Sequence, residues 1–266
     1  MTSQVARPEH GIAWITGASS GIGRATALEL ARRGWRVAVS ARNAAALEEV
    51  AEASSGRVRA FACDVTDPAA VDATIARIEA EQGPIALAFL NAGLSIHDRA
   101  PDLDAAVARR VIETNVLGLY NALAPLIGRM AARRRGQIAL CASVAGYVGL
   151  PFAAAYCASK AAAISTAVSL AVECAPLGIR VQCVNPGFVD TPLTARNDFP
   201  MPFLMSPEQA ARRIADGFSG GRFEIAFPRR LVWPMKLIGL LPYRAAIALL
   251  RLGARRGLRG RRERAE

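Results

Sequence analysis

The chain has 266 residues, of which 52% are apolar, enough to bury the core of one large domain. This composition excludes a disordered, a collagenous or a disulfide-stapled chain. The formal net charge of +11 suggests nucleic acid or an anionic membrane as a partner. Residues 229–266, however, hold eleven basic and two acidic residues, a net of +9, so the remaining 228 residues carry only +2. The basic character therefore belongs to the C-terminal segment.

Short apolar segments alternate with helical patterns, which predicts a parallel sheet with crossover helices on both faces. Seven strands are expected, over residues 11–16, 36–40, 58–63, 85–90, 137–142, 179–184 and 223–227. Helices are expected over residues 22–33, 44–53, 68–81, 107–135 with a break near Thr114, 154–173, and from the capping box at 206–209. We therefore predict one doubly wound α/β domain of the Rossmann type over residues 1–228, followed by a basic, amphipathic helical extension over residues 229–266.

The turn after the first expected strand is rich in glycine and opens a helix. Glycines allow a tight turn and a close approach to a pyrophosphate, whose charge then lies on the free N–H groups of the helix start. An ordinary tight turn is the alternative, but the position in the first strand–helix unit favours a dinucleotide site. Its expected residues are Gly17, Ser19, Ser20, Gly21, Ile22 and Gly23.

Dinucleotide folds often place an acidic residue at the end of the second strand, where it binds the ribose hydroxyls. Here that stretch reads Val39-Ser40-Ala41-Arg42-Asn43 and has no acid. The guanidinium of Arg42 suits a bidentate contact with a 2′-phosphate, so NADP(H) is expected in preference to NAD(H). A solvated surface arginine is the alternative.

Tyr156 and Lys160 lie four residues apart in an Ala-rich helical pattern, so their side chains share one face. A nearby ammonium is expected to lower the pKa of the tyrosine toward neutral pH, which suits acid–base work. Ser143 is expected in the same pocket, because the active sites of such sheets lie beyond the carboxyl ends of the strands. A chance pairing with a snorkelling lysine is the alternative, but the chain has only two lysines beside 31 arginines.

Together these motifs resemble the short-chain dehydrogenase/reductase family, and the resemblance runs from Gly11 to Thr191, with the general pattern continuing to Phe227. Further segments resemble the family's adenine contact, its fourth-strand motif, its relay asparagine and its nicotinamide turn: Asp64-Val65, Asn91-Ala92-Gly93, Asn115 and Pro186-Gly187-Phe188-Val189-Asp190-Thr191. The resemblance implies cofactor contacts from these segments, with Pro186, Gly187, Val189 and Thr191 at the nicotinamide.

The resemblance also implies a mechanism. Ser143 would bind the substrate oxygen, Tyr156 would give or take its proton, and hydride would pass between the substrate carbon and the nicotinamide. Lys160 would bind the nicotinamide ribose and tune Tyr156, and Asn115 would hold a water that links Lys160 to solvent. An asparagine bonded to the backbone is the alternative for Asn115. A homodimer or homotetramer is implied, paired through residues 115–130 and 154–173.

Residues 188–205 contain three prolines, and their apolar side chains include Leu193, Phe199, Met201, Phe203, Leu204 and Met205. This composition predicts a mobile lid over a pocket for a hydrophobic alcohol or ketone, and packing of these side chains on the protein body is the alternative. Apolar residues are also expected near the pocket, at Val144, Tyr147, Val148 and Leu150. No charged anchor is expected there, so a substrate that carries a carboxylate is not indicated.

Residues 231–242 are apolar but contain two prolines and Lys236, and no apolar run reaches the roughly 18–20 residues needed to span a bilayer. From Tyr243 the pattern is helical, with five arginines (244, 251, 255, 259 and 262) within roughly 80° of the helix circumference. A helix lying on an anionic membrane surface and a subunit contact with a solvated basic tail both fit this pattern. Nucleic acid is not expected as a partner, because the tail lacks interleaved aromatic residues.

The five cysteines lack CxxC spacing and lie in apolar stretches, and with only two histidines the sequence offers no metal site. We expect reduced cysteines and a cytoplasmic location, with peripheral membrane association through the extension as one interpretation. The leading prediction is an NADP(H)-dependent oxidoreductase acting on a hydrophobic secondary alcohol or ketone, or an aldehyde. Two alternatives stay open: a non-catalytic dinucleotide-binding redox sensor, and an NAD-dependent alcohol dehydrogenase of the same family.

Overall fold

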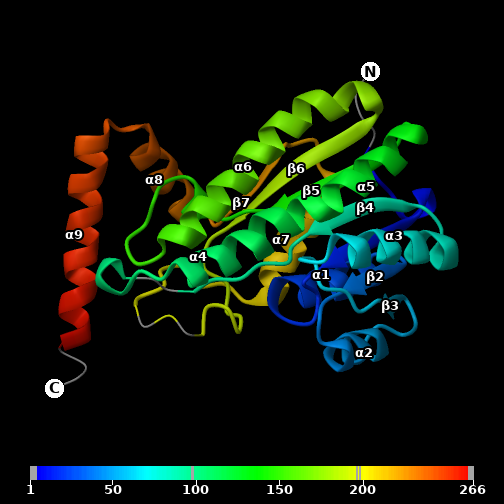
Figure 1. Cartoon of the computed structure of the whole chain (residues 1–266), viewed down its shortest axis with the longest axis horizontal. Coiled ribbons are helices and arrows are strands. Elements are labelled where there is room, and N and C mark those ends of the chain that lie inside the picture. Colours follow the sequence, from blue (N-terminus) through cyan, green and yellow to red (C-terminus); the bar gives the residue numbers. More distant parts are fainter. Residues whose placement is uncertain (1–4, 97–98, 196, 198, 263–266) are drawn as a thin grey trace.

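Seven parallel strands form one sheet in the order β3-β2-β1-β4-β5-β6-β7 (Figure 1). The computed structural model describes residues 5–96, 99–195, 197 and 199–262. The strands are β1 Ile12–Thr16, β2 Val37–Ser40, β3 Val58–Ala60, β4 Ile85–Leu90, β5 Gly136–Cys141, β6 Ile179–Pro186 and β7 Glu224–Phe227. The strand order reverses between β1 and β4, the place where doubly wound sheets bind their ligands.

Helices cover both faces of the sheet, since the central strands are buried on both sides. One apolar cluster lies around Trp14 and Ile138 and includes residues of α3, α5 and α6. The other lies around Ile15 and Phe89 and includes residues of α1, α2 and α7. The helices are α1 Gly21–Arg32, α2 Ala44–Glu52, α3 Pro68–Gln82, α4 Ala105–Ile112, α5 Gly118–Ala132, α6 Ala154–Cys174 and α7 Pro207–Ser219.

The predicted fold class is confirmed, and the differences lie at element ends. Asp67 caps α3 as its sequence predicts, and it accepts hydrogen bonds from the first-turn N–H groups. The expected break near Thr114 is a π-helical turn over Glu113–Leu117. The third strand is shorter than predicted and ends at Ala60, although the N–H groups of Phe61 and Cys63 still donate to the carbonyl oxygens of Val39 and Ala41.

One described segment, Ala154–Leu177, is long and apolar enough to cross a membrane by length and composition, with a mean hydropathy of 1.3. The sequence pattern predicts no such segment, because no uninterrupted apolar run is long enough. In the structure it consists of α6 and the turn that follows, and it packs on the sheet through Ala163, Ala167 and Cys174. A core helix of a doubly wound sheet meets the same criterion.

The C-terminal extension, residues 229–266, begins with two helices, α8 Arg229–Leu240 and α9 Tyr243–Arg262. Helix α8 tolerates Pro234 in its interior, and it buries Val232 and Met235 against a small apolar cluster that contains Val144. Helix α9 contacts α8 and stands at one end of the molecule, away from the sheet (Figure 1). The first part of the extension is therefore packed on the domain, although the sequence analysis separated the two.

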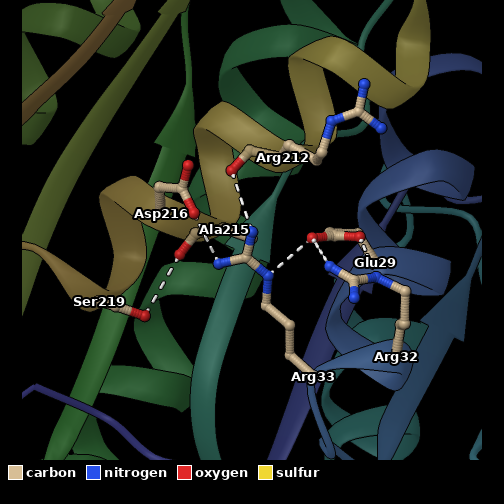
Figure 2. Close-up of polar contacts among 7 residues, drawn as sticks. All are labelled: Glu29, Arg32, Arg33, Arg212, Ala215, Asp216 and Ser219. Atoms are coloured by element: carbon tan, nitrogen blue, oxygen red, sulfur yellow. Dashed lines mark hydrogen bonds and ion pairs between the residues drawn. The ribbon is translucent and has the colours of Figure 1, made fainter.

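Helices α1 and α7 are joined by a group of charged side chains at the end of α1 (Figure 2). Glu29 accepts hydrogen bonds from Arg32 and Arg33, with the closest nitrogen–oxygen distance of each pair at 2.8 and 2.7 Å. Arg33 also contacts Asp216 of α7 at 2.8 Å. The hydrogen bond from Arg32, supported by Arg33 and opposed by burial, lowers the pKa of Glu29 from 4.5 to about 2.

Replacing Glu29 by glutamine should lower the free energy of unfolding at pH 7 by about 2 kcal/mol. Because the folded-state pKa is depressed, this stabilisation is complete above the unfolded-state value of 4.5 and is lost as the pH falls through about 2. Urea unfolding of both proteins from pH 7 down to pH 3 measures the difference, which should shrink with pH. The more exposed Glu81→Gln variant is the control and should change stability by less than about 0.5 kcal/mol; a pH-independent difference at Glu29 would contradict the prediction.

Candidate active site

A cavity of about 770 Å³ opens at the carboxyl ends of the central strands. Every predicted site residue except Gly23 and Asn115 lines it. From the N-terminal half these are Gly17, Ser19, Ser20, Gly21, Ile22, Arg42, Asp64, Val65, Asn91, Ala92 and Gly93. From the C-terminal half they are Ser143, Tyr156, Lys160, Pro186, Gly187, Val189 and Thr191. The sequence therefore identified most of the lining of one continuous cavity.

The glycine turn between β1 and α1 leaves no room for a Cβ atom at Gly17 or Gly23. Gly17 has a φ of +64°, and a Cβ atom there would lie 2.7 Å from the Cα of Ala92. A Cβ at Gly23 would lie 2.4 Å from the carbonyl oxygen of Gly17, so Gly23 allows α1 to pack on the turn and does not line the cavity. The first turn of α1 carries no acidic side chain, which leaves its N-terminal N–H groups available to an anion.

Asn91 and Thr16 hold the ends of β4 and β1 together. The side-chain amide of Asn91 donates to the carbonyl oxygens of Thr16 and Gly17, both at 3.1 Å. The Thr16 hydroxyl accepts from the backbone N–H groups of Asn91 and Ala92 at 3.0 and 3.1 Å. Asn91 thus fixes the shape of the glycine turn, and Thr16 is a site residue that the sequence analysis did not single out.

Polar side chains line the part of the cavity beyond β2 and β3. Arg42 is exposed there between Ala41 and Asn43, and no acidic residue stands in this stretch. Asp64 lies opposite, and its carboxylate accepts from the backbone N–H and the hydroxyl of Thr66 at 3.0 and 2.9 Å. This end of the cavity therefore offers one guanidinium and one fixed carboxylate.

Ser143 follows β5, and Tyr156 and Lys160 lie in the first two turns of α6. Lys160 is buried, and its ammonium donates to the carbonyl oxygen of Cys141 at 2.8 Å. The ammonium lies 5.8 Å from the centre of the Tyr156 ring. The Ser143 hydroxyl accepts from the N–H of Ala145 at 3.1 Å.

The ionisation of Tyr156 differs from the prediction. Burial raises the pKa of Tyr156 well above 10, and a hydrogen bond with Ser143 opposes this only in part. Lys160 is not among the groups that lower the pKa of Tyr156; burial lowers the pKa of Lys160 itself, and its ammonium donates to the carbonyl oxygen of Cys141. Tyr156 is therefore a protonated phenol at neutral pH, a form suited to donate a proton.

Asn115 lies in the π-helical turn, outside the main cavity, and is 4% exposed. Its side-chain oxygen Oδ1 accepts a hydrogen bond from the backbone N–H of Leu94 at 2.7 Å. Its amide donates to the carbonyl oxygen of Leu94 and to the Ser159 hydroxyl, both at 2.9 Å. The side chain is thus hydrogen-bonded to the backbone, as the alternative interpretation of Asn115 expects. It also joins the loop after β4 to α6.

Charged residues line the cavity where none were expected. Arg110 and Glu113, with Thr114, come from the end of α4 and the π-helical turn. Spacings of three and four residues place them on one helical face, a signal that the sequence contains but that the analysis did not use. The expectation of a pocket without a charged anchor is therefore wrong for this wall.

The loop after β6 packs only in part on the protein, since Leu193, Phe203 and Leu204 are exposed. Met205 is 6% exposed and joins the core, and the rings of Phe188 and Phe199 meet edge to face at 5.9 Å. Of the six apolar side chains expected to form a lid, only Leu193 lines the cavity, beside Pro192 and Thr194. The lid interpretation is thus restricted to a short segment, and the alternative describes Met205 and Phe199 better.

A polar network ties α8 to the segments that flank the cavity. Glu224 of β7 accepts from the Tyr147 hydroxyl at 2.6 Å, from the Asn185 amide at 2.9 Å, and from the ammonium of Lys236 in α8. Burial raises the pKa of Glu224, but these donors lower it by more, so the carboxylate stays ionised. Since Tyr147 follows Ser143 and Asn185 precedes Pro186, the network connects α8 to both walls of the site.

The cysteines and acidic side chains form no metal centre in the described part of the chain, where no group of three or more His, Cys, Asp or Glu residues could hold an ion. All five cysteines are free, and four of them are buried. Two cysteines, Cys63 and Cys141, line the cavity, and burial raises the pKa of both thiols, which keeps them neutral.

Residues 11–199 match the model of a family described as short chain dehydrogenase. An uncharacterized oxidoreductase of Myxococcus xanthus is 40% identical over 244 residues, which cover 90% of this chain and 95% of that protein. The 3-oxoacyl-(acyl-carrier-protein) reductase FabG of Escherichia coli is 33% identical over 221 residues, which cover 82% and 87%. The crystal structure of a short-chain dehydrogenase from Streptomyces avermitilis is similar with a TM-score of 0.79 and 27% identity, and covers 92% of this chain and 97% of that one.

Replacing Lys236 by methionine should lower the free energy of unfolding by about 1–3 kcal/mol, because the half-buried carboxylate of Glu224 would lose its cation. Urea unfolding at pH 7 measures the change. The exposed Arg244→Met substitution in α9 is the control and should cost less than about 0.5 kcal/mol. Equal losses in the two variants would show that the network does not anchor α8.

Proposed function

This chain belongs to the short chain dehydrogenase family and is an oxidoreductase, and we propose from that premise that it transfers hydride between NADP(H) and a hydrophobic alcohol or carbonyl compound. The observation that carries the proposal is the single cavity shared by the glycine turn, Arg42, Ser143, Tyr156 and Lys160. A non-catalytic sensor would need the dinucleotide end of this cavity but not Tyr156 or the buried Lys160.

The residues of the cavity fit a nicotinamide dinucleotide. The glycine turn and the N-terminus of α1 would take the pyrophosphate, and Arg42 would take a 2′-phosphate. Asp64 and Val65 would line the adenine site. Pro186, Gly187, Val189 and Thr191 would surround the nicotinamide. When bound, the cofactor supplies or accepts the hydride.

The side chains of this protein would handle the proton. Tyr156 would donate its phenolic proton to a substrate carbonyl oxygen during reduction, a role that its raised pKa favours. The Ser143 hydroxyl would bind the same oxygen. Lys160 would bind the nicotinamide ribose, and Asn115 would act as a positioning residue through its contacts with Leu94 and Ser159.

The proposed substrate is a ketone, aldehyde or secondary alcohol on an apolar framework. Leu94 and Leu193 supply apolar lining, and the name of the Escherichia coli relative describes reduction of a 3-oxoacyl group, a ketone on an acyl chain. Arg110 and Glu113 would meet any polar part of the molecule. We also propose a homodimer or homotetramer, because α5, α6 and the π-helical turn expose apolar side chains, namely Leu117, Tyr120, Val168 and Val172.

Replacing Tyr156 by phenylalanine should lower kcat for carbonyl reduction by at least about 100-fold, since the proton donor is lost. NADPH binding, followed by its fluorescence, should change little because the ring remains. A panel of apolar ketones and aldehydes assayed with NADPH provides the rate. Tyr243→Phe, at an exposed position of α9, is the control and should keep full activity, whereas full activity in Tyr156→Phe would refute the mechanism.

Replacing Arg42 by alanine should raise KM for NADPH by about 10–100-fold and leave KM for NADH unchanged, because one charge-assisted contact to the 2′-phosphate is lost. Steady-state assays with both cofactors measure the ratio. Arg36→Ala, at the opposite end of the same strand, should change neither constant. Equal use of both cofactors by the unaltered protein would favour the NAD-dependent alternative.

A further inference from the structure

The C-terminal extension presents apolar side chains to the outside. On α8, Trp233, Leu237 and Leu240 recur at spacings of four and three residues and so share one helical face. They are 62%, 60% and 81% exposed, and Tyr243 at the start of α9 is 87% exposed. We call these four side chains and Ile247 the outer face. The opposite side of α8 buries Val232 and Met235, so the outer face is left over after the domain core is complete.

The charge around the outer face is strongly positive. Residues 229–266 carry eleven basic and two acidic side chains. In the described part of this segment Lys236 forms an ion pair, whereas no ion pair is found for the exposed Arg229, Arg230, Arg244 and Arg251. Their charge is thus not neutralised by the domain and is available to an anionic partner.

We propose that the outer face docks on the surface of an anionic lipid membrane. Leucine side chains would enter the boundary between headgroups and acyl chains, Trp233 and Tyr243 would lie at headgroup level, and the arginines would contact lipid phosphates. Helix α9 stands at one end of the molecule, away from the sheet, and α8 joins it to the domain (Figure 1).

Charge decides between a membrane and a second copy of the chain. A two-fold contact through the extension would bring two segments of net charge +9 together, and their repulsion opposes association. An anionic bilayer offers the complementary charge over a broad plane, and it also accepts apolar side chains, which a free polyanion does not.

The test is co-sedimentation of the full chain with vesicles of phosphatidylcholine alone and of phosphatidylcholine with about one third phosphatidylglycerol. The protein should bind the anionic vesicles at least about 10-fold more tightly, and about 0.5 M NaCl should remove most of the difference. The double substitution Leu237→Ser with Leu240→Ser should weaken binding by at least about 10-fold. Activity without lipid should not change, because these side chains lie outside the cavity.

Leu103→Ser is the matched control, since Leu103 is 63% exposed and lies outside the extension. It should leave vesicle binding unchanged. Absence of binding by the full chain, or equal binding to both vesicle types, would overturn the proposal. So would a shift of oligomeric state in the Leu237/Leu240 variant, measured by analytical ultracentrifugation, together with unchanged vesicle binding, because the outer face would then be a subunit contact.

Discussion

The site depends on the close approach of the ends of β1 and β4. The chain segments that follow β1 and β4 lead to opposite faces of the sheet. The side-chain amide of Asn91, after β4, holds the two strand ends together by donating to the carbonyl oxygens of Thr16 and Gly17. The approach leaves no space for a Cβ atom at Gly17 or Gly23. The same bonds therefore fix the shape of the turn and the packing of α1, and the other cavity walls are arranged around this junction.

The sequence predicted the fold and most of the cavity because both depend on local signals. Strand periodicity, the Asp67 cap and the order of short motifs need only a few neighbouring residues each. The spacing of Arg110 and Glu113 places them on one helical face, but it does not show that this face lines the cavity, which depends on how the helix packs. The predicted lowering of the Tyr156 pKa was also wrong, since burial, which is a property of the assembled fold, raises that pKa.

The contacts of the C-terminal extension with the domain were also not predictable from the sequence. Its charge and composition could be read directly, but its attachment could not, because Lys236 meets Glu224 and Tyr147 only after β5, β7 and α8 have assembled. The extension has two parts with different environments. Helix α8 is packed on the domain, while α9 reaches beyond it. The predicted extension over residues 229–266 therefore contains one helix that packs on the domain and one that projects from it.

The network at Glu224 also bears on where the catalytic unit ends along the chain. One carboxylate receives hydrogen bonds from the segment after β5, from the end of β6 and from α8, so three neighbouring parts of the structure share a common anchor. Residues 229–240 lie beyond the 11–199 span of the family match, yet they supply the cation of that anchor. The folded unit should thus be delimited after α8, because a chain shortened to residue 228 would leave the partly buried carboxylate of Glu224 without its cation.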